Sequence, residues 1–114
     1  TKKFFPKANV LNLGTIDRNQ GTQEKLRILV KGEYRKEVRF EIVEREPEDV
    51  LVASLGEKEP VGNGAVYMHT LNVEIAKGSR PVSCVEREDY GKIMLSTTHP
   101  EVKTIPIYVK FSVR

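Results

Sequence analysis

The segment that decides the fold is the last strand-like stretch, Ile105-Pro106-Ile107-Tyr108-Val109-Lys110-Phe111-Ser112-Val113. Every odd-numbered position in it is apolar, and the even-numbered positions hold Pro, Tyr, Lys and Ser. Successive side chains of a β-strand point to opposite faces, so this period of two predicts a strand with one buried face. Because a buried face needs a second layer against it, the segment predicts two packed sheets.

Similar alternation recurs along the chain between clusters of turn residues. No long segment has the spacing of apolar residues that marks a helix. The sequence therefore predicts an all-β, antiparallel β-sandwich of about seven strands, with residues 56–64 as a loop and 77–81 as a turn. The expected strands are 10–13, 24–33, 36–45, 50–55, 65–77, 90–97 and the segment that begins at residue 103.

Size and composition indicate one folded domain over residues 1–114. The chain is 39% hydrophobic and 31% charged, which is typical of a globular protein. Its net charge is only +3, and the basic residues alternate with acidic ones, so nucleic-acid binding is not expected. No apolar run is long enough for a membrane helix, so we expect no membrane insertion by this domain. The first residue is Thr1 rather than Met, which suggests a domain excised or processed from a larger protein.

The residue types that carry chemistry are not arranged as a recognisable catalytic or metal site. Cys84 is the single cysteine, so no internal disulfide can form, and its expected role is a small buried hydrophobe or an inert surface thiol. The two histidines, His69 and His99, lack zinc-ligand spacing, and His69 is expected to be a partly buried strand residue with a satisfied nitrogen. The acidic clusters at 44–49 and 86–89 lack the EF-hand spacing and are interrupted by arginines. We therefore expect no enzyme activity and no cofactor.

The order of features in the C-terminal half resembles that of a known class of domains. These features are Leu71-Asn72-Val73-Glu74-Ile75 followed by Lys77-Gly78, the segment 91–100 from Gly-Lys-Ile to His-Pro, and the last strand. Leu11-Asn12-Leu13-Gly14-Thr15-Ile16 is similar to the opening strand of the same class. They resemble bacterial immunoglobulin-like domains of unknown function, akin to Hydin-type and major-sperm-protein-like sandwiches. Residues 45–50 lack the Cys-Gly-Cys segment that many members carry.

This resemblance implies an immunoglobulin-like β-sandwich without catalytic residues, in an extracytoplasmic bacterial protein at the periplasm or cell surface. The first functional hypothesis is a non-catalytic module for adhesion or protein–protein interaction, whose partner is another protein or a neighbouring domain of the same chain. Open sandwiches can bind a partner through an exposed strand edge. The alternatives are a structural spacer between domains and a calcium- or carbohydrate-binding sandwich. The candidate interaction edge is Val50, Leu51, Val52 and Ala53.

Overall fold

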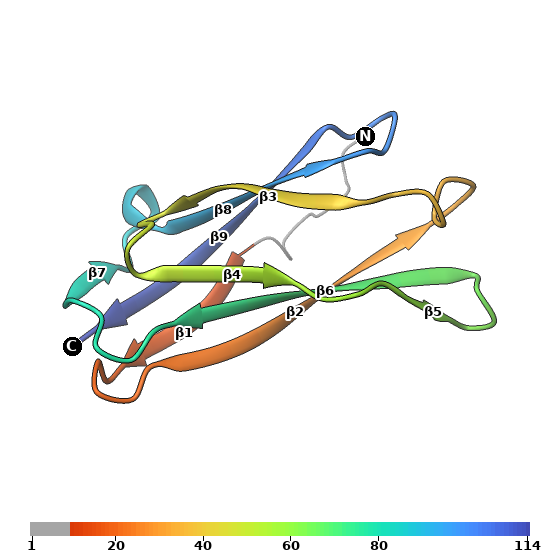
Figure 1. Ribbon diagram of the computed structural model, residues 1–114. Coiled ribbons are helices and arrows are strands. Elements are labelled where there is room, and N and C mark those ends of the chain that lie inside the picture. The colour runs from red at the N-terminus through yellow and green to blue at the C-terminus, as the bar shows by residue number, and fades with distance from the viewer. Residues whose placement is uncertain (1–9) are drawn as a thin grey trace.

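The computed structural model describes residues 10–114, which form two β-sheets around one hydrophobic core (Figure 1). Within these residues there are nine strands and a single turn of 3₁₀-helix at Arg87–Asp89. The strands are β1 (Val10–Ile16), β2 (Thr22–Lys31), β3 (Phe40–Glu46), β4 (Leu51–Leu55), β5 (Glu59–Val61), β6 (Val66–Ile75), β7 (Val82–Cys84), β8 (Gly91–Thr97) and β9 (Thr104–Val113).

The first sheet has the strand order β1-β9-β8-β3, and the short strand β7 pairs with the end of β9. The pairs β9-β8, β8-β3 and β7-β9 are antiparallel. The pair β1-β9 is parallel, with Val10 opposite Tyr108 and Ile16 opposite Val113. The first and the last described strands of the chain therefore run side by side in the same direction.

The second sheet has the strand order β2-β6-β4, and β5 also pairs with β6. All ten residues of β2 pair with β6, from Thr22 opposite Ile75 to Lys31 opposite Val66. The other side of β6 is shared, because β4 pairs with its C-terminal half and β5 with its N-terminal end. β4 and β5 thus act as one edge strand that is interrupted at residues 56–58.

The core lies between the two sheets and contains the apolar face of β9. The odd-numbered side chains of β9 are all buried, and those of Val109 and Phe111 are completely so. The two-sheet, all-β prediction from this segment is confirmed. Burying apolar surface of this kind stabilises a fold by about 25 cal/mol per Å². The other residues of the same core cluster include Ile28, Leu71, Val73, Ile75, Ile93 and Leu95, which come from both sheets.

The turn between β1 and β2 requires a glycine at its end. Gly21 has a φ of 69°, and its N–H donates to the carbonyl oxygen of Asp17 at 2.9 Å. A β-carbon at this position would lie 2.5 Å from the carbonyl oxygen of Ile75, closer than real β-carbons come. Because glycine has no β-carbon, it allows both the left-handed backbone conformation at position 21 and the close approach of this residue to the end of β6.

The structure differs from the predicted strand pattern in the number, the bounds and the direction of strands, and the strands predicted at 24–33 and 65–77 are found as β2 and β6 with shifted ends. The number of strands is nine within the described residues rather than about seven, because β5 lies in the segment predicted as a loop and β7 follows directly on a predicted turn. β3 begins at Phe40 rather than at residue 36, since residues 33–37 form a turn. The sandwich is not wholly antiparallel, because β1 pairs with β9 in parallel. The first strand continues to Ile16 instead of ending at residue 13.

No helix in residues 10–114 is long and apolar enough to cross a membrane.

Candidate binding edge and the pocket beside it

β4 forms an outer edge of the second sheet, which is where the sequence placed the candidate interaction edge. Its one strand partner within residues 10–114 is β6, with Ala53 opposite Val73 and Leu55 opposite Leu71. In Figure 1, β4 and β3 are joined by a tight turn at one end and diverge towards the other end of β4.

The hydrogen-bond register shows which residues of β4 have free backbone groups. The N–H of Gly56 donates to the carbonyl oxygen of Thr70 at 2.9 Å, so these two residues form a hydrogen-bonded pair. In an antiparallel ladder such pairs alternate along the strand. Val52 and Ser54 therefore direct their N–H and C=O groups to β6, while those of Ala53 and Leu55 point outward. No hydrogen bond within residues 10–114 uses these outward groups.

The beginning of β4 is closed by the preceding turn and by an arginine. The N–H of Leu51 donates to the carbonyl oxygen of Pro47 at 2.9 Å. The carbonyl oxygen of Leu51 accepts a hydrogen bond from Arg45 Nη1 at 2.6 Å, and the same nitrogen lies 3.1 Å from the carbonyl oxygen of Glu48. The free part of the edge is therefore the segment from Ala53 to Leu55.

The four residues predicted as the interaction edge have different environments. Val50 precedes the strand, and the side chains of Val50 and Leu51 are completely buried in the core. They cannot offer side-chain contacts to a partner, because they hold the edge against the core. Val52 is 39% exposed and Ala53 is half-buried. The accessible edge therefore runs from Ala53 to Leu55 rather than from Val50 to Ala53. Its use in binding stays a prediction.

Four other outer edges in the described part of the chain, those of β1, β3, β5 and β2, carry features that discourage strand addition. β1 has a bulge between Asn12 and Gly14, and β3 has one between Ile42 and Glu44. β5 contains Pro60, which has no N–H to donate. Bulges, prolines and charged side chains are the usual protections of sheet edges. β2 has no bulge but carries four charged residues, namely Glu24, Lys25, Arg27 and Lys31.

By contrast, β4 has the sequence Leu-Val-Ala-Ser-Leu, without a charge, a proline or a register shift. Its second half and the three-residue strand β7 are the edges of residues 10–114 that lack a charge, a proline and a register shift, and β4 is the one with a pocket beside its free end.

A pocket of about 300 Å³ opens beside the end of β4, between it and the start of β3. Three of its lining residues, Arg39, Lys58 and His69, carry basic side chains, and none is acidic. We call this space the basic pocket. It is lined by Val38, Arg39, Phe40, Leu55, Gly56, Lys58 and His69.

The two cationic side chains of the basic pocket lack carboxylate partners within residues 10–114. Arg39 is fixed through its backbone, whose N–H donates to Thr98 Oγ1 at 2.9 Å, while its carbonyl oxygen accepts from the N–H of Thr98 at 3.1 Å. Its guanidinium group makes no hydrogen bond or ion pair in this part of the chain. The Lys58 ammonium donates to the carbonyl oxygen of Lys36 and lies 5.7 Å from the ring centre of Tyr67. Both positive charges therefore remain uncompensated by a nearby acid.

His69 forms the inner wall of the basic pocket. Only 6% of its surface is exposed, and its ring meets the ring of Phe40 edge-to-face with centroids 4.7 Å apart. Burial lowers the pKa of His69, and the nearby charge of Lys58 lowers it further. Its Nε2 has no hydrogen-bond partner in residues 10–114. The sequence-based expectation of a satisfied nitrogen is therefore wrong for this atom, and buried polar atoms without partners are uncommon in folded proteins.

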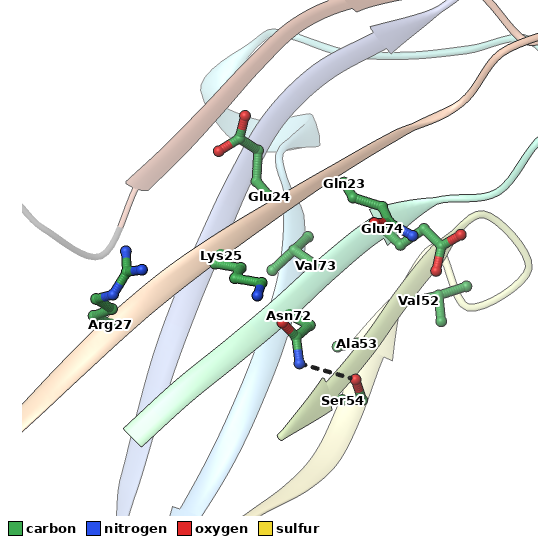
Figure 2. Close-up of a pocket in the computed structure, with 10 residues that line it drawn as sticks. All are labelled: Gln23, Glu24, Lys25, Arg27, Val52, Ala53, Ser54, Asn72, Val73 and Glu74. Atoms are coloured by element: carbon green, nitrogen blue, oxygen red, sulfur yellow. Dashed lines mark hydrogen bonds between the residues drawn. The ribbon is translucent and has the colours of Figure 1, made fainter. Parts of the chain in front are cut away.

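A second, more polar depression lies on the outer face of the same sheet and has a volume of about 560 Å³ (Figure 2). Figure 2 shows side chains from β2, β6 and β4 around it, with Asn72 Nδ2 donating to Ser54 Oγ at 3.5 Å. Both signs of charge border it, and none of its lining residues is aromatic. A flat polar face of this kind is what an antiparallel sheet leaves in water. The lining residues are Gln23, Glu24, Lys25, Arg27, Val52, Ala53, Ser54, Asn72, Val73 and Glu74.

The remaining residues singled out in the sequence lie apart from β4 or in surface pairs. Cys84 is buried, which selects the first of its two expected roles, and burial raises the pKa of its thiol. His99 Nδ1 accepts a hydrogen bond from the N–H of Glu101 at 3.1 Å. Of the acidic residues, Asp49 pairs with Arg80 at 2.5 Å on the surface. Within residues 10–114 no three His, Cys, Asp or Glu side chains are grouped so that they could hold a metal ion.

The basic pocket was not predicted from the sequence. Its three basic residues come from the segment before β3, the break between β4 and β5, and the middle of β6. Alternation tells which face of a strand a residue occupies, but not which residues of other strands lie opposite. The parity of His69 with Leu71 and Val73 did indicate that its side chain points inward.

Comparisons of the chain with protein-family models, with curated proteins and with solved structures found no match.

Proposed function

We propose that this protein is a non-catalytic interaction module that binds an extended segment of a partner protein by strand addition to β4. The observation that carries the proposal is the backbone of Ala53 and Leu55, whose outward groups are unpaired within residues 10–114, on an edge without charge, proline or bulge. Added strands gain main-chain hydrogen bonds from such an edge, and specificity comes from pockets for alternate side chains. The basic pocket at Leu55 is suitably placed to receive one of them.

The proposal extends to the type of sandwich, which we infer to be immunoglobulin-like. The strand orders β1-β9-β8-β3 and β2-β6-β4, with the first strand parallel to the last, support this inference. The sequence resemblance to bacterial immunoglobulin-like domains supports it as well, and is the sole ground for placing the protein outside the bacterial cytoplasm. The partner is then another protein or an adjoining domain of the same chain.

A proline substitution tests strand addition directly. Ala53→Pro removes an N–H that points away from β6, so the ladder inside the sheet is retained. Ala53→Ser keeps the N–H and is the matched control. The probe is a capped peptide of alternating Thr and Val residues with one central Glu, titrated against ¹⁵N-labelled protein.

We expect the parent protein and Ala53→Ser to bind the peptide, with slowed exchange of the backbone amides at position 53 and at Leu55. Ala53→Pro should fold, as shown by an unchanged spectrum for the core residues, and should lose the binding. Peptide binding that survives in Ala53→Pro, or no binding to the parent protein, would refute strand addition at β4.

A structural spacer is the second candidate, and the pairing of β1 with β9 favours it. This pairing joins the N-terminal and C-terminal parts of the described chain directly. The exposed large hydrophobic residues are also spread over separate elements, as in a domain without a continuous apolar binding surface. A spacer is expected to bind none of the peptides used above.

A further inference from the structure

We propose that the basic pocket selects a partner strand with an acidic side chain, which enters it at the position opposite Leu55. This inference rests on the proposed function, because the acidic residue reaches the pocket as part of a strand paired with β4. It specifies the chemistry of the partner, namely an extended peptide segment with an Asp or Glu at one position.

The position follows from the geometry of strand addition. The side chain of Leu55 points towards the other sheet and lines the basic pocket. A residue directly opposite Leu55 on an added strand places its side chain on the same face of the sheet. Its side chain therefore extends between the end of β4 and the start of β3, where the pocket lies.

The preference for an acid follows from charge and from the orphaned nitrogen. Arg39 and Lys58 bring two positive charges to the pocket, and no lining residue is acidic. Phe40 and Leu55 add apolar surface on which the methylene groups of Glu can pack. His69 Nε2 is buried and has no partner among residues 10–114, so a carboxylate that reaches this atom would give it one. Charge-assisted hydrogen bonds of this kind are stronger than neutral ones.

The experiment compares three capped peptides of alternating Thr and Val that differ only in the central residue, which is Glu, Gln or Lys. Their affinities for the whole chain are measured at low and at high salt. We expect the Glu peptide to bind about tenfold more tightly than the Gln peptide at low salt, with the Lys peptide weakest. High salt should reduce the difference, because part of the charge interaction is exposed.

Two variants assign the preference to the pocket. Arg39→Gln and Lys58→Gln should each reduce the preference for Glu over Gln several-fold and leave the affinity for the Gln peptide unchanged. Arg27→Gln, on the far edge strand β2, is the matched control and should keep the full preference. The ring resonances of His69 should shift with the Glu peptide more than with the Gln peptide.

The outcomes separate this inference from the proposed function. Equal binding of the Glu and Gln peptides, with loss of both in Ala53→Pro, would overturn the acidic preference while keeping strand addition. A preference for Glu that persists in both Arg39→Gln and Lys58→Gln would overturn the role of the pocket. Inorganic phosphate that shifts the pocket resonances, without any preference among the peptides, would identify a small-anion site and overturn the inference. Failure of all three peptides to bind would refute the proposed function itself.

Discussion

Gly91 lies against the ring of Phe111, and a β-carbon at position 91 would come within 3.0 Å of Phe111 Cε1. The same β-carbon would lie 3.1 Å from the carbonyl oxygen of Glu46 and 3.3 Å from Leu51 Cδ2. Gly91 is the first residue of β8, where the buried start of β4 approaches the first sheet. The absence of a side chain at position 91 thus leaves room for Phe111 of the same sheet and for Leu51 of the other sheet.

Gly91→Ala is expected to destabilise the domain by about 1–3 kcal/mol, the usual cost of adding a group to a packed core. Denaturant unfolding measures this change. Gly56→Ala is the control, because its β-carbon would meet only Thr70 atoms at 3.7 and 3.8 Å, which is ordinary contact distance. Equal midpoints for Gly91→Ala and the parent protein would show that the sheets are not in tight contact there.

Val109→Asp should cost several kcal/mol and is expected to unfold the domain, because the site is completely buried and a carboxylate there has no partner. Val43→Asp, at a bulge of β3 and 54% exposed, is the matched control and should melt close to the parent protein. Circular dichroism melting of both variants checks the prediction. A Val109→Asp variant that melts like the parent protein would contradict the inward orientation of β9.

Arg45→Met should destabilise the protein by about 1.5–3 kcal/mol, since it removes a charged donor from the carbonyl oxygens of Leu51 and Glu48 while keeping the aliphatic stem. Arg27→Met removes an exposed arginine from β2 and is expected to leave the unfolding free energy nearly unchanged. Chemical denaturation of the two variants makes the comparison. If Arg27→Met lost as much unfolding free energy as Arg45→Met, the effect would not be specific to the start of β4.

Stability should decrease as the pH falls below about 6.5, the ordinary pKa of histidine, because burial lowers the pKa of His69 in the folded protein. Above that pH the imidazole is neutral in both states and has no effect. Below it the unfolded chain takes up the proton first, and the loss continues until the lower pKa of the folded state is reached. His69→Phe, which keeps a ring against Phe40, should show a smaller decrease between about pH 7 and pH 5.5. If the stability of His69→Phe and that of the parent protein changed identically with pH, His69 would be excluded as the cause of the decrease.

Chelation distinguishes the calcium-binding alternative from the other candidates. A ligand that binds only the folded state raises its stability by mass action. Because residues 10–114 contain no group of three acidic, His or Cys side chains that could hold a metal, EDTA and added calcium are expected to leave the melting temperature unchanged. A melting temperature that shifts on chelation and is restored by calcium would support the calcium-binding alternative.

The alternation of apolar residues was enough to predict the buried faces but not the pairing of the strands. The odd-numbered positions of β9 are all buried, as the period of two implies. Pro60 and the surrounding glycines led to the prediction of a loop at β5. The segment is nevertheless a strand, since edge strands tolerate proline where central strands do not. Val38 is buried although it lies between the turn at residues 33–37 and the start of β3 rather than in a strand, so its apolar side chain indicated burial and not secondary structure.

The binding edge was only partly predictable for the same reason. The uncharged run around Val52 indicated a strand, but the sequence could not show that Leu51 belongs to the core while Ala53 and Leu55 have outward backbone groups. That distinction depends on the ladder with β6 and on the turn at Pro47. Tertiary packing alone brings Arg39, Lys58 and His69 together. Their spacing in the sequence does not predict that they share a pocket.

The parallel ladder between β1 and β9 has a mechanical consequence. Tension applied at Val10 and Arg114 would pull these two strands in opposite directions along their length. The hydrogen bonds between the strands would then share the force and would have to break together. A sheet opened from one end would instead lose its bonds one at a time. In single-molecule stretching from these two points, the domain is expected to yield in one abrupt step.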